Sequence, residues 1–163
     1  MSRRLTVLVL AWVAACGAHA AAQSATATLS APLTPIARLS LSTNSLSFPD
    51  GDPDLVPRVS AMQGPVTITA KARASQGGVV TLTVLASDDL RSGITVLPAS
   101  LVTWTGSGPG FVPGTLSRAT AQTVATWTGS GVHSGTLTFL FENRWTHPTG
   151  TYTVTLVYTL SVP

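Results

Sequence analysis

The chain has 163 residues, of which 9% are charged and 44% are hydrophobic, and its formal net charge is +3 at pH 7. Two of its nine basic residues lie in the leader described next, so seven basic residues remain against six acidic ones, without a run of like charge. A nucleic-acid-binding surface needs clustered basic residues, so we expect no nucleic-acid partner.

Residues 1–20 have the pattern of a cleaved export signal. Arg3 and Arg4 precede an apolar run from residue 5 to residue 15, and Ala18-His19-Ala20 supplies the small residues at which signal peptidase cleaves. The run is shorter than the roughly 20 apolar residues that span a bilayer. We expect cleavage after Ala20 and an exported protein that is extracellular, on the cell surface or periplasmic.

The one cysteine of the chain lies inside this leader. Its removal leaves a mature chain without thiols, which can form neither a disulfide nor a cysteine-based metal site. Val13-Ala14-Ala15-Cys16 also resembles a bacterial lipobox, in which the cysteine becomes a lipidated first residue. We expect Cys16 to be removed with the signal. Lipidation of Cys16 is the alternative, and it alone would attach the protein to a membrane.

Residues 21–35 form a low-complexity segment; from Ser24 to Pro35 it consists of Ala, Thr, Ser, Leu and Pro, and small or apolar residues alternate with polar ones. Such a segment can be a flexible leader, an edge strand with its proline at a bulge, or a strand donated to a neighbouring molecule. We expect a leader or first edge strand in front of a domain at residues 36–163. Donation of Ser24 to Pro35 is the alternative.

The remainder of the chain alternates with the two-residue period of β-strands and lacks the 3.6-residue apolar period of helices. The longest alternation covers residues 151–162. Residues 66–74 and 80–86 also alternate, and the Gln76-Gly77-Gly78 turn between them predicts a β-hairpin. Further strands are expected at residues 36–42, 45–48, 94–97, 101–104, 122–127 and 137–141.

Turns rich in Gly, Pro and Asp separate these seven to nine short strands. The pattern predicts an all-β fold, a single antiparallel β-sandwich of Ig-like or jelly-roll-like order. Gly150-x-Tyr152 in front of the last strand predicts a corner in which the tyrosine hydroxyl bonds back to the backbone.

A five-residue unit occurs twice, as Trp104-Thr105-Gly106-Ser107-Gly108 and as Trp127-Thr128-Gly129-Ser130-Gly131, and Gly-Thr-Leu follows each copy. Two copies are too few for a solenoid. We interpret them as two strand-turn-strand units that use the same corner, with the tryptophan ending a strand and the glycines adopting unusual dihedral angles.

Asp50-Gly51-Asp52-Pro53-Asp54 is the best metal candidate, because three carboxylates at alternate positions can converge on Ca²⁺. The segment lacks the glutamate and the glycine spacing of an EF-hand. Each of its residues also has an explanation as part of a turn. We expect a turn that binds no cofactor or metal, with calcium binding by Asp50, Asp52 and Asp54 as the alternative.

Three tryptophans, Trp104, Trp127 and Trp145, are candidates for a platform on which sugar rings stack. Large aromatic residues more often fill the core of a sandwich or cover its ends, and we expect that role here. The chain has no Gly-x-Ser-x-Gly or His-Glu-x-x-His motif, and its acids cluster in turns. We therefore expect no enzyme, although His133 or His147 in a Ser-His-Asp triad is an alternative.

The Trp-Thr-Gly-Ser-Gly unit, the Asn143-Arg144-Trp145 turn and the ending from Gly150 to Pro163 resemble bacterial secreted β-sandwich proteins of the WxL-like and pilin-like surface type. Tyr158-x-Leu160 stands where the WxL pattern has Trp-x-Leu. The resemblance implies a cell-surface or extracellular structural module.

The sequence thus predicts a non-enzymatic structural or adhesive module at the bacterial cell envelope. Its expected partners are envelope proteins or surface glycans. The alternative is a carbohydrate-binding module that uses exposed tryptophans and calcium.

Overall fold

The computed structural model describes residues 26–163, so the predicted cleavage site at Ala20 and the lipidation candidate Cys16 lie outside the described residues. Contacts group residues 33–163 into one compact unit. Residues 26–35 belong to no strand and are exposed throughout, with Leu29 96% and Leu33 74% exposed. In this structure they form a leader rather than an edge strand.

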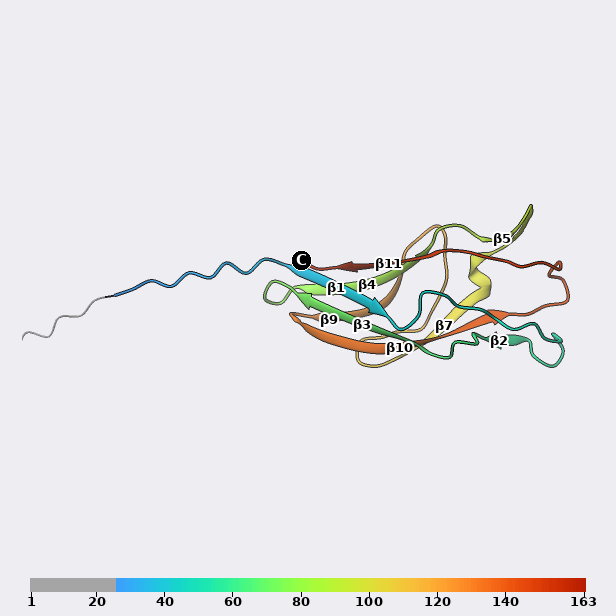
Figure 1. Ribbon diagram of the computed structural model, residues 1–163, viewed down its shortest axis with the longest axis horizontal. Coiled ribbons are helices and arrows are strands. Elements are labelled where there is room, and N and C mark those ends of the chain that lie inside the picture. Colours follow the sequence, from blue (N-terminus) through green and yellow to red (C-terminus); the bar gives the residue numbers. More distant parts are fainter. Residues whose placement is uncertain (1–25) are drawn as a thin grey trace, which may run out of the picture. The chain divides into compact units, whose positions relative to one another are not determined.

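The compact unit is all-β, as the sequence predicts, and its two larger antiparallel sheets pack against each other (Figure 1). The first sheet has the order β1-β3-β10-β7-β8, and β2 pairs with the end of β10 beyond β3. Its strands are β1 (Ile36–Leu41), β2 (Arg58–Ser60), β3 (Val66–Arg73), β7 (Val102–Ser107), β8 (Gly114–Thr115) and β10 (Gly131–Glu142).

The second sheet has the order β11-β4-β9, with β4 (Val79–Ala86) in the centre between β9 (Gln122–Thr128) and β11 (Leu156–Ser161). A small hairpin of β5 (Leu90–Ser92) and β6 (Thr95–Leu97) follows β4 and leads into the 3₁₀ turn Ala99–Leu101. Thr153, just before β11, makes a bridge to Arg91 of this hairpin.

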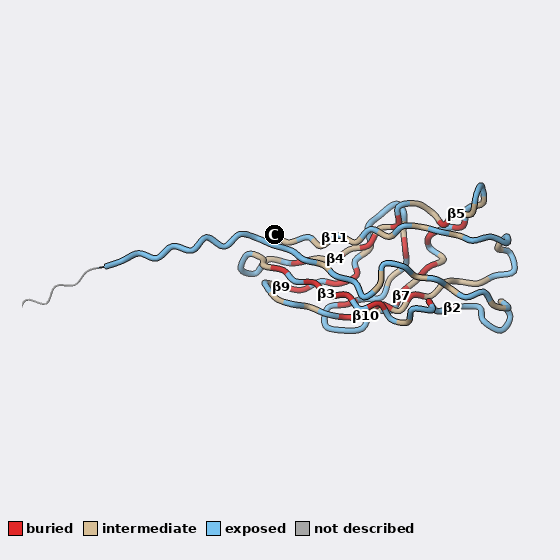
Figure 2. The backbone as a smooth tube through the Cα atoms, in the orientation of Figure 1, coloured by how far each residue is buried: buried red, intermediate tan, exposed pale blue. Residues whose placement is uncertain are grey.

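The core forms where the alternating faces of the two sheets meet. Along β3 and β4 every second residue is buried, which places one face of each strand against the opposite sheet. Trp104 and Phe139, whose ring centroids are 6.2 Å apart, are the largest fully buried side chains. Burial is concentrated in the inner strands, whereas β1 and β11 have no buried residue (Figure 2).

The predicted hairpin of residues 66–74 and 80–86 is wrong, because β3 and β4 belong to different sheets. Gln76-Gly77-Gly78 forms an arch that carries the chain across the core, and the β9–β10 connection crosses in the same way. The two crossings are tied together, since Gly129 N–H donates to the Gly78 carbonyl (2.8 Å) and the Ser130 hydroxyl bonds both backbone groups of Ala74.

Two other predicted strands differ from the structure. Residues 45–48 form no strand; this segment is held by the Gln63 side chain, which accepts from Ser47 N–H at 2.8 Å. The last strand begins at Leu156 rather than Thr151, although its predicted inward residues do pack against the core. The predicted tyrosine corner is confirmed, because the Tyr152 hydroxyl donates to the Pro148 carbonyl at 2.9 Å.

The repeated Trp-Thr-Gly-Ser-Gly unit does not use one corner twice. Gly106 remains within β7, whereas Gly129 has φ +81° and turns the chain from β9 into β10. What the copies share is the following Gly-Thr-Leu. In each, the glycine lies against an aromatic ring, Gly114 against Trp104 and Gly135 against Phe111, so that a Cβ would collide with the ring.

The two sides of the sandwich differ. On one side the segment before β8 joins the sheets, because Val112 N–H donates to the Val124 carbonyl and Thr126 N–H to the Gly110 carbonyl. On the other side β1 and β11 are the end strands of their sheets, and among the described residues no strand pairs with the outer edge of either. β1 and β11 come close to each other but form no strand pairing within residues 26–163, so the backbone edges of both sheets are unpaired on this side.

Candidate functional site

A cleft of about 1390 Å³ lies between the sheets on the side of these unpaired edges. Its walls come from β1, from the irregular segment of residues 43–53, and from β10 and β11 with the turn that joins them. Apolar side chains line its interior, among them Leu46, Phe48, Phe141, Val154 and Leu156. A concave site with mainly apolar walls and a few polar groups is typical of a binding site.

Asn143, at the end of β10, organises the mouth of the cleft. Its side-chain amide donates to the carbonyl of Gly51 at 2.9 Å and to that of Val56 at 3.3 Å, and its backbone N–H donates to Pro57. These bonds fix the loop from Asp50 to Asp54, called the Asp-rich loop below, against the turn that follows β10. The contribution of Asn143 was not predicted; the only signal in the sequence is its place directly after a strand, where an amide often caps a loop.

Trp145 is the exposed aromatic residue of the mouth, with 68% of its surface accessible. Its indole N–H donates to the Asp54 carboxylate at 3.1 Å, so the ring is held in one orientation although it is exposed. Trp104 and Trp127, in contrast, are buried in the core at 1% and 9% exposure. The three tryptophans therefore do not form the shared platform that sugar stacking would require.

Tyr158 projects from β11 into the inner part of the cleft. Burial raises the pKa of its hydroxyl to about 12, because the charged phenolate is poorly solvated there. Among the described residues its hydroxyl makes no hydrogen bond to the protein. The neutral hydroxyl is thus a polar group that a bound molecule can reach.

His147 lines the cleft near its mouth, with its ring 5.7 Å from that of Phe141. Its Nδ1 atom is buried and has no hydrogen-bond partner among the described residues. The other candidate histidine, His133, lies at the opposite end of β10 and stacks on Trp127 at 4.4 Å between ring centroids. The structure therefore does not bring the two histidines together.

The three predicted calcium ligands lie on the loop at the mouth, and each carboxylate has a local role. Asp50 accepts from Gly51 N–H, Asp52 from Asp54 N–H, both at 2.9 Å, and Asp54 from the Trp145 indole. Within residues 26–163, no group of three or more acidic, histidine or cysteine side chains has the geometry of a metal site. The loop is the turn that its Asp, Gly and Pro residues predict.

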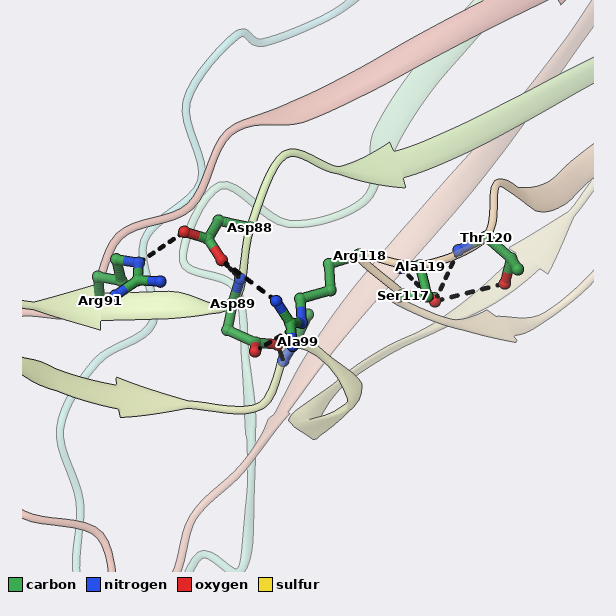
Figure 3. Close-up of polar contacts among 8 residues, drawn as sticks. All are labelled: Asp88, Asp89, Arg91, Ala99, Ser117, Arg118, Ala119 and Thr120. Atoms are coloured by element: carbon green, nitrogen blue, oxygen red, sulfur yellow. Dashed lines mark hydrogen bonds and ion pairs between the residues drawn. The ribbon is translucent and has the colours of Figure 1, made fainter.

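A second polar cluster lies away from the cleft mouth, where the loops around β5 and β8 meet (Figure 3). The Arg91 guanidinium donates to Asp88 at 2.6 Å, and this hydrogen bond is the main reason that the pKa of Asp88 is lowered and that of Arg91 raised. Asp89 bridges Arg118 Nε and the backbone N–H of Ala99, both at 2.9 Å. The cluster fastens the 3₁₀ turn to the sheet, which is a structural role.

No helix in residues 26–163 is long and apolar enough to cross a membrane. Comparisons with protein-family models, with curated proteins and with solved structures returned no match for this chain. The resemblance to WxL-like and pilin-like proteins therefore stays a prediction from the residues that carry it.

Proposed function

We propose that this chain is a non-enzymatic, exported structural module of the bacterial envelope that binds an extended strand of a partner protein. The strand adds to the free edge of β11, and its alternate side chains enter the cleft. One observation carries this proposal: an unpaired strand edge borders an apolar cleft.

Both the strand edge and the cleft have groups that a bound strand can satisfy. An edge strand presents backbone N–H and C=O groups that can pair with another chain, and long unprotected edges are hazards that proteins cover. β11 is such an edge, and its inward residues Leu156, Tyr158 and Leu160 are only partly buried. Strand addition satisfies the backbone, and the side chains of the added strand fill the cleft.

The test uses a synthetic peptide of seven residues with leucine at alternate positions and serine or threonine between them. We expect binding, measured by calorimetry, together with slower amide hydrogen exchange along β11. Absence of binding at millimolar peptide, or binding without protection of β11, would overturn the proposal.

Two substitutions on the same segment provide a matched control. Val154→Trp places a large ring in the cleft and should weaken peptide binding at least tenfold, because Val154 lines the cleft. Val157→Trp adds the same ring on the outer face, where Val157 is 48% exposed, and should leave binding unchanged. Equal effects of the two substitutions would contradict a strand whose side chains enter the cleft.

A carbohydrate-binding module is the second candidate, favoured by the exposed and immobilised ring of Trp145. A single ring supports stacking of one sugar unit. Binding of soluble envelope polysaccharides that is lost in Trp145→Ala and retained in Val154→Trp would support this function instead.

A further inference from the structure

The mouth of the cleft carries negative charge that the protein does not neutralise. Among the described residues, Asp88, Asp89 and Glu142 form ion pairs with arginines, whereas Asp50, Asp52 and Asp54 form none. All three unpaired acids lie on the loop at the mouth. In a chain with only six acidic residues, half of them are therefore concentrated there without a cation.

The arginine that lines the cleft does not supply the missing charge. Within residues 26–163, Arg144 is the only lysine or arginine that lines the cleft, and its Nε donates to the Glu142 carboxylate at 3.0 Å. Arg58 lies opposite Glu142 in the register of β2 and β10, and among the described residues it forms no ion pair. The guanidinium of Arg144 is thus directed at Glu142, and the three aspartates of the loop have no ion-pair partner in the part of the chain that the structure describes.

Trp145 adds a second feature that favours a cation. Its ring is exposed, and its indole N–H is bound to Asp54, so the face of the ring is presented in a fixed position beside a carboxylate. A lysine or arginine side chain gains from the face of a tryptophan ring and from nearby carboxylates together. Trp145 itself belongs to the lining of the cleft, together with the apolar side chains of its walls.

We propose that the cleft selects an extended apolar segment that carries a lysine or arginine beside its apolar residues, with the basic side chain placed between Trp145 and the Asp-rich loop. This inference rests on the proposed strand binding and names its partner more closely. Residues 21–35 contain no charged residue, so the N-terminal segment of a second copy lacks this chemistry. The partner is accordingly another protein.

The experiment compares peptides that share one alternating leucine core and differ at a single flanking position, which is Lys, Gln or Glu, placed at either end. With the mature protein at low salt, we expect one of the two lysine peptides to bind about fivefold or more tightly than its glutamine counterpart. The matching glutamate peptide should bind more weakly still. The preference should shrink at high salt, because both interactions lie at the surface.

Substitutions at Asp54 and Trp145 separate the contribution of the carboxylate charge to the lysine preference from that of the tryptophan ring. Asp54→Asn keeps an oxygen that accepts from the Trp145 indole but removes the charge, and it should reduce the lysine preference without changing the affinity for the glutamine peptide. Trp145→Ala should reduce the preference further. Asp88→Asn removes an acid far along the chain from this loop and should change nothing.

The outcomes distinguish this inference from the function on which it rests. Equal binding of the lysine, glutamine and glutamate peptides would overturn the charge selection while leaving strand binding intact. Failure of all three peptides to bind would overturn both. Tighter binding of a peptide with the sequence of residues 24–35 than of the lysine peptides would show that the occupant is a second copy of this chain.

Discussion

Gly110 and Gly129 have the same backbone conformation, φ +81°, but different surroundings. A Cβ on Gly129 would meet nothing within 4 Å, whereas one on Gly110 would lie 2.3 Å from the Thr126 carbonyl oxygen. That carbonyl belongs to β9, and Gly110 makes the hydrogen bond that joins this side of the sandwich. The close approach, rather than the positive φ alone, makes Gly110 difficult to replace.

We therefore expect Gly110→Ala to destabilise the protein by about 2 kcal/mol or more beyond the effect of Gly129→Ala. The dihedral strain, about 1–2 kcal/mol, is common to both substitutions, so their difference measures the steric contact. Urea unfolding of the two variants checks it. Equal free energies of unfolding would contradict the close approach at Gly110.

The hydroxyl of Tyr158 gives the protein a pH dependence in alkali. Its pKa of about 12 in the folded state lies above the ordinary value of 10, so the folded protein holds this proton more tightly than the unfolded chain. The stabilisation is complete below pH 10 and is lost as the pH rises from 10 towards 12. We expect a loss of roughly 2 kcal/mol over that interval.

Urea unfolding at mildly and strongly alkaline pH measures this loss. Tyr158→Phe should remove most of the decline, because phenylalanine has no proton to lose. Tyr152→Phe is the matched control, since it removes the other tyrosine hydroxyl of the chain and should leave the decline in place. A decline that persists in Tyr158→Phe would mean that other groups cause it.

The three tryptophans show which side-chain positions can be predicted from the sequence and which cannot. Alternation indicates that Trp104 and Trp127 can face inward on their strands, and both are buried. Trp145 lies in a turn, where no alternation predicts the direction of its side chain, and its indole is bound to Asp54, a residue 91 positions earlier. Contacts over such separations leave no local pattern.

At the scale of elements, the 3₁₀ turn Ala99–Leu101 depends on Asp89. Both oxygens of this carboxylate are used, one by the backbone N–H of Ala99 and one by Arg118, and its side chain is 19% exposed. The neighbouring Asp88 is 39% exposed and contacts Arg91 and Arg118 at the surface. Two adjacent aspartates thus have unequal structural roles.

We expect Asp89→Ala to cost about 1–3 kcal/mol of unfolding free energy, because it leaves the partly buried Ala99 N–H without a partner. Asp88→Ala should cost less, since solvent replaces a surface pair. Thermal unfolding of both variants provides the comparison. A larger effect of Asp88→Ala would contradict the assigned roles.

The wrongly predicted hairpin has a physical explanation at this scale. A two-sided strand pattern and a Gly-rich turn are common to a hairpin within one sheet and to an arch between two sheets. Whether the chain forms a hairpin or an arch depends on the hydrogen bonds made by the turn. Here Gly129 and Ser130, more than 50 residues away, bond to the turn and its flanking residue Ala74. The sequence does predict the strands and their inward faces, since alternation is local.

At the scale of the whole molecule, most strand pairs join distant parts of the chain. Ser60 pairs with Leu140, and Ala86 with Leu156, while only β5 with β6 and β7 with β8 pair as consecutive strands among those described. Chains dominated by such pairings close long loops before contacts compensate for the lost entropy.

We accordingly expect refolding from urea in milliseconds to seconds, the range of non-local all-β domains. Stopped-flow fluorescence of the buried Trp104 and Trp127 follows it, with Trp145→Phe used to remove the exposed reporter. Folding within microseconds would be inconsistent with this topology.

Both ends of the compact unit leave it at the arch between β3 and β4. Ile36, the first residue of β1, pairs with Arg73, and the carbonyl of Pro163 accepts from Ser75 N–H (Figure 1). Tension applied through the two ends of the chain would therefore peel β1 and β11 away one residue pair at a time, starting at the arch, instead of shearing all pairs at once. The module yields to a weak pull along its own chain, whereas a pull on a strand seated along β11 can meet the combined resistance of many bonds.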